Sequence, residues 1–279
     1  MKRLKRDLFI VAIIFAMVAF RRDIVASLPA SITGFFIKND DRIIDLSKKI
    51  RYKGIPEVKE TGKITDSLHC DPFFTDDDKK TTADFLVYAK TDMLKRPGQA
   101  FACISSKTLS DTDTVADSKI QPTGWMDSTY PKIIPGKFLY KKCHTVSSRL
   151  VNTIDDTREN TFIGTQYMYE MGLKKQEDKV IKYLKKNPKN HVLYRVTPIY
   201  MSGNKIAKHV VVEAYSIEDK GKLSFCVAVH NEQPGVLIYY ANGKNQYRDP
   251  DSVTEADKQI PIPKVKSQSN KRLKKKTDK

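Results

Sequence analysis

The chain has 279 residues, 40% of them hydrophobic, which is enough for one good-sized domain with extensions and does not require two. Its net charge of +17 suggests a nucleic-acid partner, but residues 1–22 carry +5 and residues 264–279 carry +7, so the middle of the chain keeps only +5. This distribution excludes a domain that is basic throughout. It confines a basic surface to residues 174–208, where the excess of positive charge is +8. A lysine-covered helix face exposed to solvent would explain that excess equally well.

The N-terminal segment has the features of an export signal. A basic start precedes an apolar run from Leu8 to Phe20, which has the length of a signal-peptide core and is short for a membrane span. Arg21 and Arg22 interrupt the run, and the apolar stretch from Ile24 to Phe36 offers no clear cleavage site. We therefore expect residues 1–40 to be a signal peptide or a retained membrane anchor. The protein is expected to be secreted or membrane-anchored and extracytoplasmic.

The cysteines are scattered and include no Cys-x-x-Cys pair, which argues against a structural zinc site. If the protein is exported, disulfides can form, but the sequence leaves three pairings or none open. The four residues are Cys70, Cys103, Cys143 and Cys226.

Residues 41–249 are predicted to form the folded domain, and its first half shows two elements. Thr81 to Met93 is predicted to be a helix, because Phe85 and neighbouring apolar residues follow a Thr/Asp start. Ala100 to Ile104 is predicted to be a short buried strand, and a polar loop over Ser105 to Ser118 follows it.

The second half predicts a mainly antiparallel sheet with few helices. Alternating apolar residues indicate a set of strands, at His191–Ile199, Ile206–Ile217, Leu223–His230 and Val236–Tyr240. A helix is predicted over Leu173–Lys186, and the polar, lysine-rich residues 250–279 are predicted to be a disordered basic tail.

Glu177 is an anomaly on the predicted helix. It falls on the same face as the apolar residues Leu173 and Val180, so an ionisable group is turned toward the core. Two interpretations remain open: an ion pair with Arg195 or a lysine, or a role in a functional site.

Common enzyme motifs are absent. The sequence has no phosphate-binding Gly-x-x-x-x-Gly-Lys loop, no Gly-x-Ser-x-Gly and no His-Glu-x-x-His. Cys143 beside His144 does not predict a thiol dyad, because neighbouring residues of a strand project to opposite faces.

Several segments resemble the DNA/RNA non-specific endonucleases, the ββα-metal (His-Me finger) nucleases, and their streptococcal members in particular. The segment Phe138–His144 is similar to the family's Tyr-Asn-Arg-Cys-His or Asp-Arg-Gly-His box. Glu159–Tyr169 is similar to Asn-Leu-Ile-Thr-Gly-Thr-Arg-Tyr-Met-Asn. Further matching segments occur in the same order as in the family, at Arg96–Ala100, Gln121–Trp125, Asn190–Pro198, Val212–Ser216 and Asn231–Val236.

The resemblance implies an α+β fold with an antiparallel central sheet, a ββα-metal motif and a few flanking helices. It implies phosphodiester hydrolysis in which His144 is the general base and one hydrated Mg²⁺ (or Mn²⁺) contacts the scissile phosphate. Asn160 would support the metal or orient the site, and Glu177 matches a family glutamate near the metal.

The chain departs from the family pattern at three site positions. Tyr169 stands where the family has its metal-binding asparagine, and a neutral phenol is a poor ligand for a hard cation. Lys142 replaces the box arginine as a candidate catalytic residue, keeping the charge but losing the bidentate fork. Gln166 replaces the arginine of the second matching segment and keeps neither its positive charge nor its bidentate fork.

Two functions therefore stay open. The chain is either a metal-dependent endonuclease whose activity Tyr169 impairs, or an inactive relative that binds DNA or RNA backbone. A third, weaker interpretation has the basic tails bind anionic lipid, and the N-terminal segment would in any case contact a membrane. The residues expected to contact nucleic acid are Lys141, Lys142, Gln166, Lys174, Lys175 and Arg195.

Overall fold

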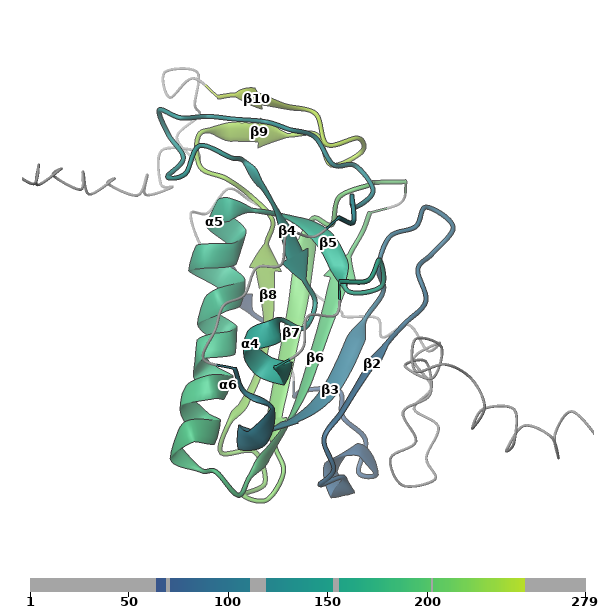
Figure 1. The fold of residues 1–279 in the computed structure, drawn as a ribbon, viewed down its shortest axis with the longest axis vertical. Coiled ribbons are helices and arrows are strands. Elements are labelled where there is room, and N and C mark those ends of the chain that lie inside the picture. Colours follow the sequence, from purple (N-terminus) through teal and green to yellow (C-terminus); the bar gives the residue numbers. More distant parts are fainter. Residues whose placement is uncertain (1–63, 69–70, 111–118, 153–155, 202, 249–279) are drawn as a thin grey trace, which may run out of the picture.

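A computed structural model describes residues 64–68, 71–110, 119–152, 156–201 and 203–248, and an antiparallel sheet forms its centre (Figure 1). The predicted α+β class with a mainly antiparallel sheet is confirmed. In sheet order the strands are β1 (Thr65–Ser67), β8 (Ser224–His230), β7 (His209–Ser216), β6 (His191–Ile199), β3 (Ala100–Ser105) and β2 (Phe85–Tyr88). Two short hairpin sheets accompany it, β4 (Tyr140–His144) with β5 (Thr161–Thr165) and β9 (Val236–Ile238) with β10 (Asn245–Tyr247).

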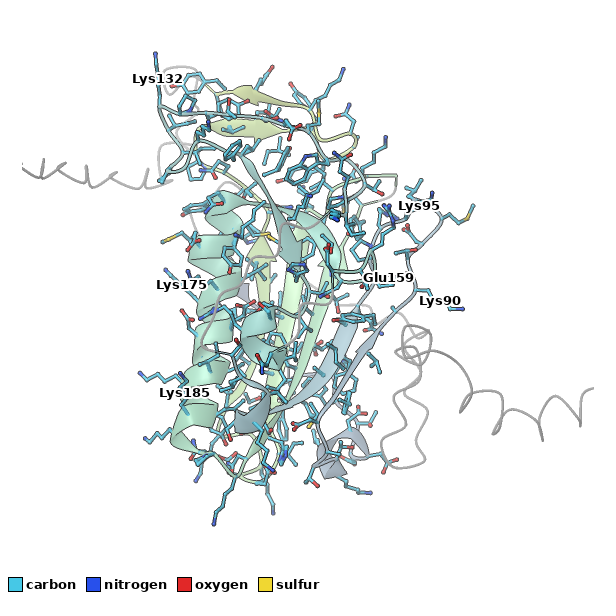
Figure 2. The ribbon with its side chains drawn as sticks, viewed as in Figure 1. Lys90, Lys95, Lys132, Glu159, Lys175 and Lys185 are labelled. Atoms are coloured by element: carbon cyan, nitrogen blue, oxygen red, sulfur yellow. The ribbon has the colours of Figure 1, made fainter. Side chains whose placement is uncertain are left out.

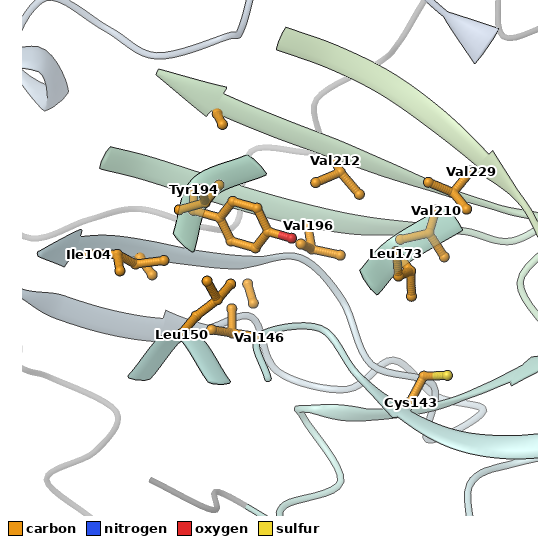
Figure 3. Packing of buried hydrophobic residues seen from close by; sticks show 14 of the residues in the cluster. Ile104, Cys143, Val146, Leu150, Leu173, Tyr194, Val196, Val210, Val212 and Val229 are labelled. Carbon is orange, nitrogen blue, oxygen red and sulfur yellow. The ribbon is translucent and has the colours of Figure 1, made fainter. Parts of the chain in front are cut away.

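Both faces of the central strand β6 are buried. Val192, Tyr194 and Val196 belong to the main hydrophobic core, which β7 and β8 complete from the sheet side (Figure 3). On the opposite face Leu193 packs into a second core, together with Phe101 and other aromatic residues. Because a fully buried apolar side chain of this size contributes about 1.5–3 kcal/mol, both cores stabilise β6 at the centre of the sheet.

A continuous helical rod covers one face of the sheet (Figure 1). It consists of α5 (Gln166–Met168), a π-helical turn (Tyr169–Leu173) and α6 (Lys174–Lys186). Leu173, Val180 and Leu184 are buried against the sheet, as their helical spacing predicted. The rod begins seven residues before the predicted start at Leu173, since the hydroxyl of Thr165 accepts the Met168 backbone N–H at 2.9 Å and caps the first turn. Short helical turns elsewhere are α4 (Ser148–Val151), Asp78–Lys80 and Ser106–Thr108.

The prediction of a helix over Thr81–Met93 is wrong. The segment contains β2 instead, which pairs antiparallel with β3 so that Phe85 lies opposite Cys103. Phe85 and Val87 are buried while the residues between them are partly exposed, which is the period of a strand. Four consecutive apolar residues fit a strand and a helix equally well, and pairing with β3 decides for the strand.

Several sequence expectations fall outside the described residues: the signal peptide or anchor over residues 1–40, the basic tail over residues 250–279 and most of the polar loop before residue 119. Within the described part of the chain, no helix has both the length and the apolarity needed to cross a bilayer. Cys226 takes part in a disulfide, whereas Cys103 and Cys143 are free and buried; Cys70 is not among the described residues.

Gly172 lets the helical rod approach the sheet, because a Cβ at this position would lie 2.3 Å from Cγ1 of Val229. Alanine favours a helix over glycine by about 1 kcal/mol, but overpacking costs typically about 1–3 kcal/mol. We expect Gly172→Ala to lower the free energy of unfolding by about 1 kcal/mol in urea titrations. The neighbouring exposed-side change Met171→Ala should stay within about 0.5 kcal/mol of the wild type. Equal stability of Gly172→Ala and wild type would contradict the close packing on β8.

Candidate active site

The segments that carry the site form a ββα unit. Strands β4 and β5 pair antiparallel, with Cys143 opposite Phe162 and His144 opposite Thr161, and the helical rod follows β5 directly (Figure 1). Gly164 permits this packing, because a Cβ there would lie 2.6 Å from both the Cys143 sulfur and the Met168 side chain. The hairpin and the helix are therefore in contact at the positions where the two sequence boxes fall.

The side chains of β4, which belong to the segment that matches the family, alternate between the two faces of the strand. Cys143 belongs to the core beneath the helix, and on the same face the Lys141 ammonium lies 4.4 Å from the centre of the Tyr169 ring. On the other face the Lys142 ammonium lies 5.6 Å from the Trp125 ring. Burial raises the pKa of the Cys143 thiol to about 12, and the nearby Lys141 charge opposes this only in part. A Cys143 thiolate nucleophile is thereby excluded at neutral pH.

His144 ends β4 close to a carboxylate. Its Nε2 lies 4.0 Å from Oδ1 of Asp156, and both of these atoms are buried, although each side chain as a whole is partly exposed. Asp156 belongs to the connection between β4 and β5 and also accepts the backbone N–H of Lys119. Sequence reasoning did not select Asp156, and the available signal was an acidic residue shortly before Asn160 in the same connection.

Asn160 fixes the chain just after His144. Its side chain is buried, and its Oδ1 accepts the Thr145 hydroxyl at 2.7 Å and the Val146 N–H at 3.1 Å. Its Nδ2 donates to the Val146 carbonyl at 3.2 Å, and its own carbonyl accepts the Thr145 N–H at 2.9 Å. Both ends of the carboxamide are thus used to hold the turn that follows β4. Asn160 positions the end of the strand that carries His144.

Glu177 is buried in an ion pair, although the partner differs from the expected ones. Its Oε2 lies 2.9 Å from Nη1 of Arg149, on α4, and Arg149 also bonds Asp178. Burial lowers the pKa of Arg149, but the hydrogen bonds and charges of Asp178 and Glu177 outweigh it and raise the pKa above its usual value. The expected partner Arg195 instead lies 3.6 Å from Glu213.

Arg195 is separate from the other predicted nucleic-acid contacts. Its side chain is buried, it donates to the Phe73 carbonyl at 2.7 Å, and its guanidinium lies 4.7 Å and 4.8 Å from the Phe74 and Phe101 rings. This places it in the second core, where nucleic acid has no access. The expectation that Arg195 contacts nucleic acid is wrong, because the match to a family segment gave no information on the face of β6.

The remaining candidates gather around the first turns of the helical rod. The Lys174 ammonium lies 5.9 Å from the Tyr169 ring and 3.3 Å from Oε2 of Glu170. The Gln166 amide lies 3.5 Å from the other Glu170 oxygen. Lys175 is exposed on the helix (Figure 2). Tyr169 itself is buried in the main core, so its ring is a fixed platform beneath Lys141.

These residues do not fit a divalent cation. Among the described residues there is no group of three His, Cys, Asp or Glu side chains that could hold a metal ion, but the single hydrated ion that the resemblance implies needs fewer protein ligands. The Asn160 carboxamide is engaged with the turn after β4, and the Glu177 carboxylate with Arg149. At the remaining position, Tyr169 presents an aromatic ring with an ammonium over it, and this charge repels a metal ion.

The Arg149–Glu177 pair gives a stability prediction. Arg149→Ala leaves the Glu177 charge buried without its partner, so we expect the free energy of unfolding to fall by about 3–5 kcal/mol. Adding Glu177→Gln to that variant should restore part of the loss, which a double-mutant cycle measures by chemical denaturation. The control is Lys175→Ala, a change of an exposed side chain on α6, the helix that carries Glu177. A cost for Arg149→Ala no larger than that of Lys175→Ala would show that the pair is not buried in solution.

The comparisons with known proteins agree with this geometry. The structure of NucA from Streptococcus agalactiae with magnesium bound aligns with a TM-score of 0.55 at 21% identity, covering 64% of this chain and 83% of that one. The metal-free structure of the same nuclease gives a TM-score of 0.52 at 21% identity, covering 61% and 81%. These likenesses establish a shared fold, and no curated protein matches. A family model described as DNA/RNA non-specific endonuclease matches residues 77–218, which is about half of the chain. The match includes the ββα unit and the sheet strands β6 and β7. This chain therefore belongs to the DNA/RNA non-specific endonuclease family.

Proposed function

We propose that this protein hydrolyses phosphodiester bonds of DNA or RNA, with His144 as the general base. The observation that carries the proposal is the pair of His144 and Asp156 at the end of β4, inside a ββα unit of this family. A neutral imidazole accepts a proton from the attacking water, and the Asp156 carboxylate lies 4.0 Å from the Nε2 of that imidazole. Asn160 supports this role by holding the turn next to His144.

Lysines near the ββα unit supply the contacts to the substrate. Lys141, Lys142, Lys174 and Lys175 lie on β4 and the first turns of α6, and Gln166 lies at the start of the rod. Ammonium groups bind phosphate oxygens, which are the same at every position of a nucleic acid. The proposed activity is therefore independent of base sequence, and its substrate is the backbone.

The metal requirement is a separate question for this chain. NucA from Streptococcus agalactiae was solved with magnesium bound. In this chain the residues that the sequence resemblance assigns to the metal are engaged or replaced, as described above, so we assign no catalytic step to a metal ion. This misfit supports a second candidate function, a nucleic-acid-binding member of the family that does not cleave.

We also propose an extracytoplasmic location, either secreted or anchored. The basic and apolar N-terminal sequence supports it. The disulfide at Cys226 supports it independently, because disulfides persist in oxidising compartments.

His144→Ala decides between the two functions. If His144 is the general base, purified protein should degrade plasmid DNA, and the variant should be slower by about 10²–10⁴-fold. Assays in Mg²⁺, in Mn²⁺ and in EDTA should accompany the comparison, with Lys132→Ala as the control for a lost surface charge. Identical traces for wild type and His144→Ala would remove the catalytic function and leave the binding function.

Asp156→Asn tests the partner of His144. The change removes the carboxylate while keeping the size of the side chain, so we expect kcat to fall on the order of tenfold with KM unchanged. The measurement is initial rates over a range of oligonucleotide concentrations. If KM rises while kcat stays constant, Asp156 contributes to substrate binding rather than to the action of His144.

A further inference from the structure

We propose that the Lys141 ammonium, held over the Tyr169 ring, supplies the positive charge that receives a nucleic-acid phosphate without a divalent metal ion. The inference rests on the proposed function and specifies how a backbone phosphate is bound on the helix side of β4, the face opposite to that of His144. It arises from the misfit between the donor set and a metal ion, since the position of the family's metal-binding asparagine carries an aromatic residue with a cation above it.

The first support is geometric. Lys141 is the second residue of β4 and projects toward the helix, and its ammonium lies 4.4 Å from the centre of the Tyr169 ring. Tyr169 is 6% exposed and packs in the main core, so the ring cannot move away from the strand. A cation over the face of an aromatic ring is attracted by the ring's negative face. The ring therefore holds the end of a flexible lysine side chain at one place.

The second support is the local charge balance. Two ammonium groups share the Tyr169 ring, because Lys174 lies 5.9 Å from its centre. Glu170 offsets the charge of Lys174 at 3.3 Å, whereas within the described part of the chain Lys141 has no carboxylate at ion-pairing distance. The surplus charge thus belongs to Lys141, which is partly exposed and can meet an anion from solvent.

The third support is chemical. An ammonium is a compact point charge with several N–H donors, and lysine is a common phosphate ligand in proteins. A divalent ion placed beside it would be repelled and would find a phenol in place of an amide oxygen. The substitution at residue 169 and the lysine at residue 141 therefore act in the same direction: both disfavour a metal ion and favour a phosphate.

The test is binding of a fluorescein-labelled DNA oligonucleotide to the full chain, followed by fluorescence anisotropy in EDTA and in Mg²⁺. The two buffers are matched in ionic strength with NaCl. The wild-type dissociation constants measured in EDTA and in Mg²⁺ should then agree to within about twofold. Lys141→Ala should weaken binding in EDTA several-fold and lower the salt dependence of log K by about 1, the loss of one phosphate contact. The matched control is Lys132→Ala, an exposed lysine in another part of the molecule (Figure 2), which should keep the wild-type salt dependence.

Variants of the ring give a second measurement. Tyr169→Leu removes the platform and should weaken binding in EDTA as Lys141→Ala does, with thermal unfolding confirming that the variant is folded. Tyr169→Asn restores an amide and should make binding respond to Mg²⁺.

The outcomes separate this inference from the proposed function. Wild-type binding that needs Mg²⁺, or equal effects of Lys141→Ala and Lys132→Ala, would overturn the role of Lys141 and leave the proposed nuclease intact. Absence of binding in both buffers would contradict the proposed function as well.

Discussion

The buried carboxamide of Asn160 is the constraint on which the site depends. Its two ends bond Thr145 and Val146, so the chain after β4 is tied to the residue that precedes β5. An amide buried without such partners would cost free energy, which gives the turn a strong preference for this one geometry. The position of His144, one residue before the turn, follows from it.

Several charges of the ββα unit and of the central sheet are paired within the protein. Glu177 is paired with Arg149, Arg195 lies near Glu213, and Lys174 lies near Glu170. In the first pair a buried carboxylate that could have served a metal ion instead joins α4 to α6. The family fold is thus retained with Glu177 paired to Arg149, because the packing of a fold does not depend on the side chains of its functional site.

Sequence patterns predicted the parts of the fold in which local and tertiary preferences agree. The alternation in β6, β7 and β8 and the apolar spacing of α6 both match the structure, because these segments are long enough to show a period. The segment with β2 was misassigned, since four apolar residues have no distinguishable period and only the pairing with β3 makes them a strand.

The sequence by itself determined the family and the elements with a clear period, which are β6, β7, β8 and α6, because each follows from residues close together in the chain. Tertiary structure alone decided the partners. Asp156 came beside His144, Arg149 beside Glu177 and Lys141 over Tyr169 through the folding of connections and the packing of the helix on the hairpin. Arg195 entered the core by the same means. Contacts between residues distant in sequence depend on how faces meet in space, and a linear pattern does not contain that information.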